Sequence, residues 1–109
     1  MKPIVEIETS FEKREDAVHM AELLLDEKLV ACAMVTNAIT SMYEWENTRC
    51  QVQEFLLRAK TRPSLEQQCF DLINKRHPYK LPMITSFIRK ASVEYADWVE
   101  LCTKGDALK

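Results

Sequence analysis

Residues 75–83 (KRHPYKLPM) carry several side chains whose types suggest chemistry. They include His77, one of two histidines in the chain, which is followed by a proline and then by Tyr79. An imidazole can ligate a metal, exchange a proton or bridge two polar groups through its ring nitrogens. Three roles therefore stay open for His77: a metal ligand, a wall of a ligand cleft, or a residue that ends a helix and positions the following loop.

Basic and aromatic residues elsewhere in the chain suit a cleft that accepts anions. Arg58, Lys60 and Arg62 alternate along the chain, so their side chains share one face if this segment is a strand. Further basic residues follow later in the chain, at Lys75, Arg76 and Lys80. If subunits associate and gather these residues around aromatic rings, the cleft between them would hold small anionic ligands. A solvated strand end with ordinary charges explains the pattern equally well. The residues predicted to line the cleft are Tyr43, Trp45, Lys60, His77 and Tyr79.

The four cysteines form no recognisable metal or disulfide motif. They are widely spaced and include no Cys-x-x-Cys pair, so we expect reduced thiols. A catalytic thiol needs a base within reach and an oriented third group, and the chain has neither a nucleophile motif nor a glycine-rich phosphate loop. The sequence therefore favours a binding protein over an enzyme. The cysteines are Cys32, Cys50, Cys69 and Cys102.

Length and charge limit the classes of function. A chain of 109 residues has room for one domain, which we expect to span residues 1–109. The formal net charge of -2 argues against binding to nucleic acid. We find no apolar run of a signal peptide and no segment that reaches the roughly 18 apolar residues of a membrane span. We expect a cytoplasmic protein whose partners are metal ions, small molecules or copies of itself.

The first part of the chain predicts a strand followed by a helix. Residues 4–9 alternate polar and apolar side chains, which predicts a strand with Val5 and Ile7 facing inward. We expect Ser10 to cap the helix that follows. The helix carries one stripe at helical spacing, which comprises Ala17, Met20, Ala21, Leu24, Leu25 and Lys28.

The last part of the chain predicts a helix, a strand and a second helix. Residues 63–77 carry a helical stripe and a capping-box pattern of Ser64 and Gln67, and the helix should end before the proline that follows. Residues 83–91 predict a strand, and Ser92 is suited to cap a final helix.

The centre of the chain predicts a long hairpin. No helical period holds over residues 30–62, which indicates two strands with a turn at residues 46–48. Asn47 suits this turn because asparagine tolerates positive φ, and Gly105 is the only glycine in the chain. Arg49 should then lie near Glu44 or Glu46. The side chains expected to share one face are Ile39, Ser41, Tyr43, Trp45, Cys50, Val52, Glu54 and Leu56.

The predicted hairpin is too long for its own domain. Strands of about 15 residues at roughly 3.3 Å per residue extend near 50 Å, whereas a domain of this length is about 35 Å across. We therefore expect the hairpin to overhang and to be covered by other subunits, with a bent hairpin folded onto its own core as the alternative. The order of elements predicts an α+β fold, a ferredoxin-like βαββαβ domain with a C-terminal helix.

Five separated blocks resemble the CutA divalent-cation-tolerance family: DEKLVACAMV, ITSMYEWEN, FLLRAKTRPSL, RHPYKLPMI and YADWV. The resemblance extends from residue 4 to residue 99. It implies a ferredoxin-like fold, a tight homotrimer built through the long strands, binding of copper or other divalent cations, and a role in metal tolerance. The positions that match the family's motifs are Ala31-Cys32, Thr40-Ser41, Tyr43, Trp45, Lys60-Thr61 and His77-Pro78-Tyr79.

The chain departs from this family at positions where relatives carry metal donors. A cysteine of some members falls at Glu8, a glutamate at Met83 and a histidine at Arg76. Of the ligands proposed for bacterial relatives, His77 alone is retained. We therefore expect a non-enzymatic homotrimer that binds copper or another divalent cation, with His77 as its metal ligand. The alternative is a signalling module that binds a small anionic metabolite in an intersubunit cleft.

Overall fold

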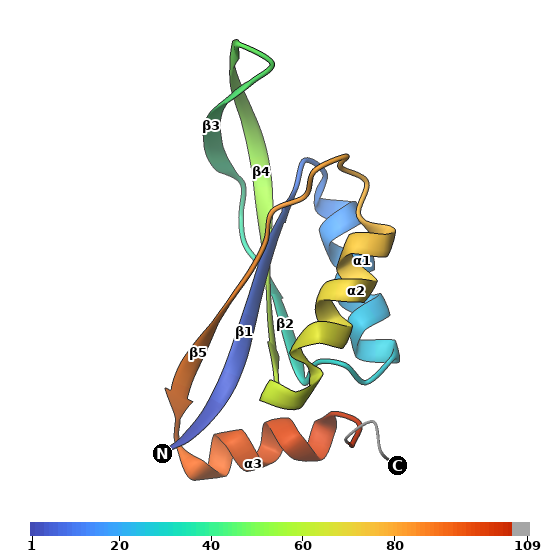
Figure 1. Ribbon diagram of the computed structural model, residues 1–109, viewed down its shortest axis with the longest axis vertical. Coiled ribbons are helices and arrows are strands. Elements are labelled where there is room, and N and C mark those ends of the chain that lie inside the picture. Colours follow the sequence, from blue (N-terminus) through green and yellow to red (C-terminus); the bar gives the residue numbers. More distant parts are fainter. Residues whose placement is uncertain (106–109) are drawn as a thin grey trace.

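The computed structural model describes residues 1–105, which form a five-stranded sheet and three α-helices (Figure 1). This order confirms the predicted α+β, ferredoxin-like fold with a C-terminal helix. Of the domain expected over residues 1–109, the last four residues lie outside the described part. The elements are β1 (Lys2–Phe11), α1 (Arg14–Asp26), β2 (Cys32–Val35), β3 (Ile39–Trp45), β4 (Thr48–Thr61), a 3-10 turn (Pro63–Leu65), α2 (Glu66–Arg76), β5 (Ile84–Ala91) and α3 (Val93–Cys102).

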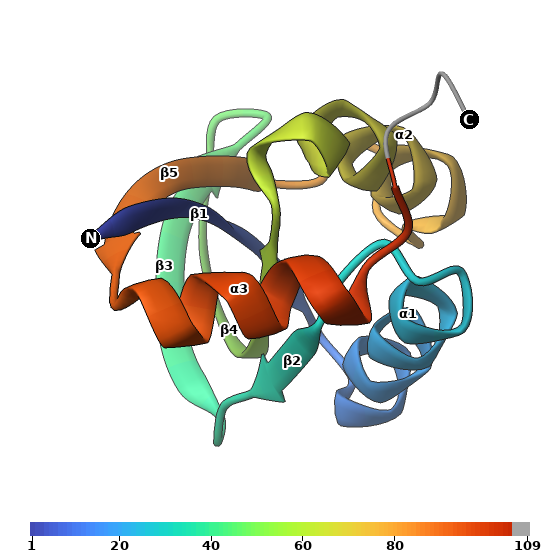
Figure 2. The same ribbon diagram turned by 90° about the horizontal axis from the view of Figure 1, so that it is seen from below.

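The antiparallel sheet has the strand order β2-β4-β1-β5, and β3 pairs with the first half of β4. Helices α1 and α2 cover one face of the sheet (Figure 1). Helix α3 crosses the end of the sheet at which β1 begins (Figure 2). No helix among residues 1–105 is long and apolar enough to cross a membrane.

Strand β1 is longer than the six residues expected from alternation. Its pairing with β4 continues through Ser10 opposite Leu56 and Phe11 opposite Phe55. The prediction that Ser10 caps the first helix is therefore wrong, because Ser10 lies inside the sheet. Helix α1 begins at Arg14 without a side-chain cap at its N-terminus.

The main core lies between the sheet and helices α1 and α2. Val5 and Ile7 are each 1% exposed, which confirms their inward orientation on β1. Leu25 lies on the solvent side of α1, and Lys28 follows the helix with φ 56°, so the stripe is shorter than predicted. The stripe residues that are buried are Ala17, Met20, Ala21 and Leu24.

The predicted ends of the later helices are partly confirmed. The capping box of Ser64 and Gln67 does not form, because Ser64 lies in the 3-10 turn that precedes α2. Helix α2 ends at Arg76, as predicted, and the backbone N–H of His77 donates to the carbonyl oxygen of Ile73. At α3, the Ser92 hydroxyl accepts a hydrogen bond from the Tyr95 N–H at 3.2 Å, which confirms the predicted cap.

The central hairpin overhangs the rest of the chain, as predicted (Figure 1). Its turn contains Glu46 and Asn47 with φ of 51° and 65°, and Arg49 forms an ion pair with Glu44 at 3.3 Å. The register, with Tyr43 opposite Cys50, confirms the predicted shared face. The first long strand is interrupted between β2 and β3, whereas β4 is continuous. The overhang gives the chain a long shape of 46 × 26 × 23 Å.

Candidate functional site

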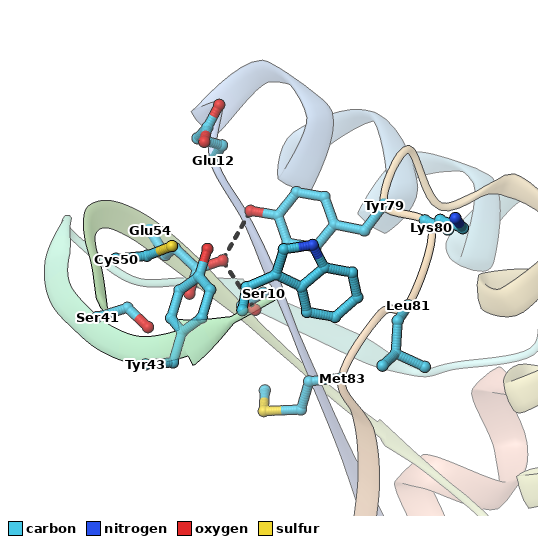
Figure 3. A pocket seen from close by; sticks show the side chains of 11 residues that line it. Ser10, Glu12, Ser41, Tyr43, Cys50, Glu54, Tyr79, Lys80, Leu81 and Met83 are labelled. Atoms are coloured by element: carbon cyan, nitrogen blue, oxygen red, sulfur yellow. Dashed lines mark hydrogen bonds between the residues drawn. The ribbon is translucent and has the colours of Figure 1, made fainter. Parts of the chain in front are cut away.

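A pocket of about 620 Å³ opens where the overhanging hairpin meets the rest of the subunit (Figure 3). The end of β1 and the residues after it form one wall, β3 and β4 form another, and the loop between α2 and β5 closes a third side. The lining residues are Ser10, Glu12, Ser41, Tyr43, Trp45, Cys50, Glu54, Tyr79, Lys80, Leu81 and Met83.

Glu54 is the buried acidic group of this pocket, with 7% of its surface exposed. It lies on β4 opposite Ile39, and the two-residue period of the strand places it on the same face as Cys50. The Tyr79 hydroxyl donates to Glu54 Oε2 at 2.7 Å, and the Ser10 hydroxyl donates to the same oxygen at 3.3 Å. These bonds join three segments that are far apart in the sequence.

His77 lies beside the pocket and holds the loop that carries Tyr79. The Tyr79 N–H donates to His77 Nδ1 at 3.1 Å. Nδ1 therefore has no proton, so the neutral ring carries its proton on Nε2, which donates to the Ser10 carbonyl oxygen 2.9 Å away. The imidazole also stacks on Phe11, with ring centroids 4.3 Å apart. This geometry supports the loop-positioning role of His77.

Burial shifts the pKa values of the groups around Glu54. Desolvation lowers the pKa of His77, although its bond to the Ser10 carbonyl acts in the opposite direction. Burial raises the pKa of the Tyr79 phenol well above its ordinary value, and the Glu54 carboxylate raises it further. The pKa of Tyr43 is also raised, mainly by burial and then by the proximity of Cys50 and Glu54. The site thus favours a neutral imidazole and protonated phenols at neutral pH.

The structure brings together some of the residues predicted to line the cleft. Tyr43, Trp45 and Tyr79 line the pocket. His77 contacts Tyr79 from outside this lining. Lys60 lies toward the other end of β4, with its ammonium 5.7 Å from the centre of the Tyr95 ring. Within one subunit, the predicted cleft is therefore divided between two places.

The other basic residues of the predicted stripe also have partners away from the pocket. Arg58 pairs with Glu8 at 2.8 Å, and Arg62 donates to the Thr103 hydroxyl at 3.0 Å. Among the residues that line the pocket, Lys80 is the one basic side chain, against the carboxylates of Glu12 and Glu54. The pocket of one subunit is therefore acidic and aromatic, unlike the anion-accepting cleft that the sequence suggested.

A metal ion held by His77 does not fit the described subunit. Both ring nitrogens of His77 are engaged, and Glu8 is paired with Arg58. Met83 lines the pocket, but no three His, Cys, Asp or Glu residues among residues 1–105 converge closely enough to hold a metal. A single subunit therefore supplies no complete set of ligands.

The thiols do not form a pair with His77 of the kind that an enzyme would use. Cys69 lies in the core, where burial raises its pKa to about 12, and its Sγ lies 3.5 Å from the Leu29 carbonyl oxygen. Cys50 lines the pocket, with its Sγ 3.7 Å from the Thr48 carbonyl oxygen. Because the His77 nitrogens bond to Ser10 and Tyr79, the imidazole is not positioned as a base for either thiol.

Sequence reasoning missed several residues that define the pocket. Glu54 is the most important of them, and a signal was present, because it occupies an inward position in the alternating face that was predicted for the hairpin. Ser10 was assigned to a helix cap and not to the site. Lys80 was among the basic residues expected near the cleft, and it does line the pocket. Glu12 and Leu81 gave no signal, since only the folded chain brings them next to the hairpin.

Comparison with known proteins finds one matching family and several similar proteins. Residues 5–102 match the family described as CutA1 divalent ion tolerance protein. "Protein CutA, chloroplastic" from Arabidopsis thaliana is 31% identical over 103 residues, covering 94% of this chain and 57% of that protein. The "Divalent-cation tolerance protein CutA" of Thermus thermophilus is 33% identical over 86 residues, covering 78% of this chain and 84% of that protein.

A solved structure of this kind has a very similar fold. The crystal structure of the divalent ion tolerance protein CutA1 from Ehrlichia chaffeensis superposes with a TM-score of 0.90 at 34% sequence identity. The match covers 95% of this chain and 98% of the Ehrlichia chain. The chain therefore spans nearly all of a known structure, although it spans only 57% of the length of the Arabidopsis protein.

Proposed function

The chain belongs to the CutA1 divalent ion tolerance family, and from this premise we propose that it acts in divalent-cation tolerance as a non-enzymatic homotrimer that binds copper or another divalent cation. The observation that carries the proposal is the overhanging hairpin, whose apolar side chains lack a cover within residues 1–105. The exposed large side chains of β3 are Ile39, Met42, Tyr43 and Trp45.

Open strand edges support assembly through strands. Strands β2, β3 and β5 each have one partner strand among the described residues, so each leaves one edge open. Strand β5 also exposes Phe87 and Ile88, the latter to 69%. Open edges that carry apolar side chains are suited to pairing with another copy of the chain.

Assembly would also supply the metal donors that one subunit lacks. Copper and other divalent ions need several converging ligands, and these do not meet within residues 1–105. We place the cation between subunits. For His77 to be a ligand there, the Tyr79 N–H would have to leave Nδ1.

Two measurements test this function. Sedimentation velocity should show a trimer, which a stable monomer would contradict. Met42→Glu should weaken association about tenfold or more, because it places a charge in a covered apolar face. The control Leu101→Glu alters a residue that is 82% exposed on α3 and should leave association unchanged.

Calorimetric titration with copper and with zinc tests the metal and the role of His77. The wild-type trimer should bind at least one of these ions, and we expect His77→Ala to weaken binding about tenfold or more if the imidazole ligates or orders the site. His19→Ala is the control, since His19 is exposed on α1. Equal affinities of the wild type and His77→Ala would remove His77 from the metal site.

We also propose a cytoplasmic location. The Arabidopsis relative does not support this location, since it is named a chloroplastic protein. The alternative function, a signalling module that binds an anionic metabolite between subunits, is supported by the aromatic side chains of the pocket. The charges of one subunit do not favour it, since the pocket contains Glu12 and Glu54 against Lys80.

A further inference from the structure

Glu54 is a buried carboxylate that forms none of the ion pairs seen among residues 1–105. Both hydrogen bonds that it accepts within these residues reach Oε2, and both come from uncharged hydroxyl groups, those of Ser10 and Tyr79. A buried charge is costly unless an opposite charge or a full set of hydrogen bonds compensates for it. The carboxylate thus has one oxygen, Oε1, available for a cation that enters the pocket.

The surroundings of this carboxylate are aromatic and apolar. Figure 3 shows Glu54 between the side chains of Tyr43 and Tyr79, with Leu81 and Met83 on the opposite side of the pocket. Phenol rings attract cations through the negative potential of their faces. The pocket therefore combines an acceptor for a charged donor with walls that suit an apolar body.

The size and charge of the pocket distinguish among possible ligands. A volume of about 620 Å³ suits an organic molecule better than a bare ion, and no cluster of three metal donors is present among residues 1–105. An anion would meet the carboxylates of Glu12 and Glu54, against the single basic lining residue, Lys80. We propose that the pocket binds a small organic cation, an ammonium group attached to an apolar body.

This binding site requires no metal ligand, so it does not depend on the proposed metal binding. It does require that the proposed trimer leaves the pocket side of Tyr43 and Trp45 open, because both residues line the pocket. The ammonium would donate to Glu54 Oε1, while its apolar part packs against Tyr43 and Leu81. Tyr79 and Ser10 hold Oε2 and so fix the direction in which the carboxylate faces the ligand.

Three probes of similar shape test the charge preference on the wild-type protein. Benzylammonium, benzyl alcohol and benzoate have the same ring and differ in charge. We expect benzylammonium to bind about tenfold more tightly than benzyl alcohol, because a charged hydrogen bond is stronger than a neutral one. Benzoate should bind most weakly. Calorimetry gives the affinities, and NMR of the two indole N–H groups should show a shift at Trp45 and none at Trp98, which lies on α3.

A matched pair of variants assigns the effect to one carboxylate. Glu54→Gln keeps the shape and can still accept from Tyr79, but it removes the charge. This variant should bind benzylammonium about tenfold more weakly than the wild type does, and its affinity for benzyl alcohol should be unchanged. Glu44→Gln is the control, because Glu44 lies on the same hairpin, is paired with Arg49 and does not line the pocket.

Several results would overturn the proposal. Equal or tighter binding of benzoate would show that the pocket prefers anions. Failure of all three probes to bind would show that the charge of Glu54 is satisfied within the assembly. Displacement of benzylammonium by equimolar copper or zinc would assign the pocket to a metal. The comparison of probes on the wild type does not depend on whether Glu54→Gln folds, and loss of metal binding would leave its outcome unchanged.

Discussion

Strand β4 belongs to two regions of the molecule with opposite surroundings. In its second half, Leu57 and Ala59 are each 1% exposed, because β1 and β2 flank this part of the strand and helix α1 contacts it. In its first half, Arg49 and Gln51 are exposed, and β3 is the only described partner strand. The same strand is therefore covered by its own chain at one end and is exposed at the other.

The pocket lies at the border between these two regions. We call the described residues outside β3, the turn and the first half of β4 the body. Glu54 lies on β4 where the hairpin joins the body, and it accepts hydrogen bonds from Tyr79 and Ser10 of the body. The body thus fixes a carboxylate on a strand whose continuation is exposed. Substitutions in the body should act on folding, whereas those in the hairpin should act on association and ligand binding.

The largest effect is expected in the body. Leu57→Ala should lower the free energy of unfolding by about 2–5 kcal/mol, because it removes buried methyl groups and leaves a cavity between the sheet and α1. Chemical denaturation followed by circular dichroism measures this change.

The hairpin supplies the matched control for Leu57. Met42→Ala alters a side chain that is 60% exposed, and we expect it to change the unfolding free energy of the separate subunit by less than about 0.5 kcal/mol. A similar loss of stability in both variants would remove the distinction between the two regions.

A smaller effect is expected at the border. His77→Phe preserves an aromatic ring against Phe11 but leaves the Ser10 carbonyl and the Tyr79 N–H without their partner. We expect a loss of about 1–3 kcal/mol in stability, measured by chemical denaturation at pH 7. A loss as large as that of Leu57→Ala would instead indicate damage to the core.

The pH dependence of stability reports the same imidazole. The folded-state pKa of His77 lies below its ordinary value of 6.5. As the pH falls, His77 is therefore protonated in the unfolded chain at a higher pH than in the folded chain. The neutral His77 imidazole therefore contributes fully to the free energy of unfolding above pH 6.5. This contribution is lost as the pH falls from 6.5 through the folded-state pKa. The variant His77→Phe should lack this component, and the control His19→Gln should retain it. An unchanged pH profile in His77→Phe would show that other groups cause the dependence.

The fold could be predicted largely because local patterns and packing agree. The alternation around Val5 and the helical stripe that contains Leu24 correspond to buried faces of β1 and α1. The prediction for Ser10 failed because pairing with Leu56 extends the sheet beyond the point where local preference favours a helix cap. Local sequence does not show how far a strand finds a partner.

The site was harder to predict than the fold, because residues that share one face of a strand can still lie far apart along it. Lys60 and Glu54 are six positions apart on β4, which corresponds to about 20 Å. The alternating basic pattern suggested that Lys60 lines the cleft, yet its ammonium lies beside the Tyr95 ring. The burial of Glu54 depends on Tyr79, which follows a helix that begins after β4 ends. The contact between Glu54 and Tyr79 can therefore be recognised only once the fold is known.

The smallest of the expected losses of stability is at the turn of the hairpin, where the backbone of Asn47 adopts a positive φ. Asn47 has φ 65°, a conformation that is strained for residues with a β-carbon but that asparagine tolerates. Asn47→Ala should destabilise the hairpin by about 1 kcal/mol, whereas Asn47→Gly should be neutral or slightly stabilising. Hydrogen exchange of the amides of β3 and of the first half of β4 should accelerate in Asn47→Ala, while the amides near Leu57 keep their protection. Equal acceleration near Leu57 would mean that the hairpin and the body unfold as one unit.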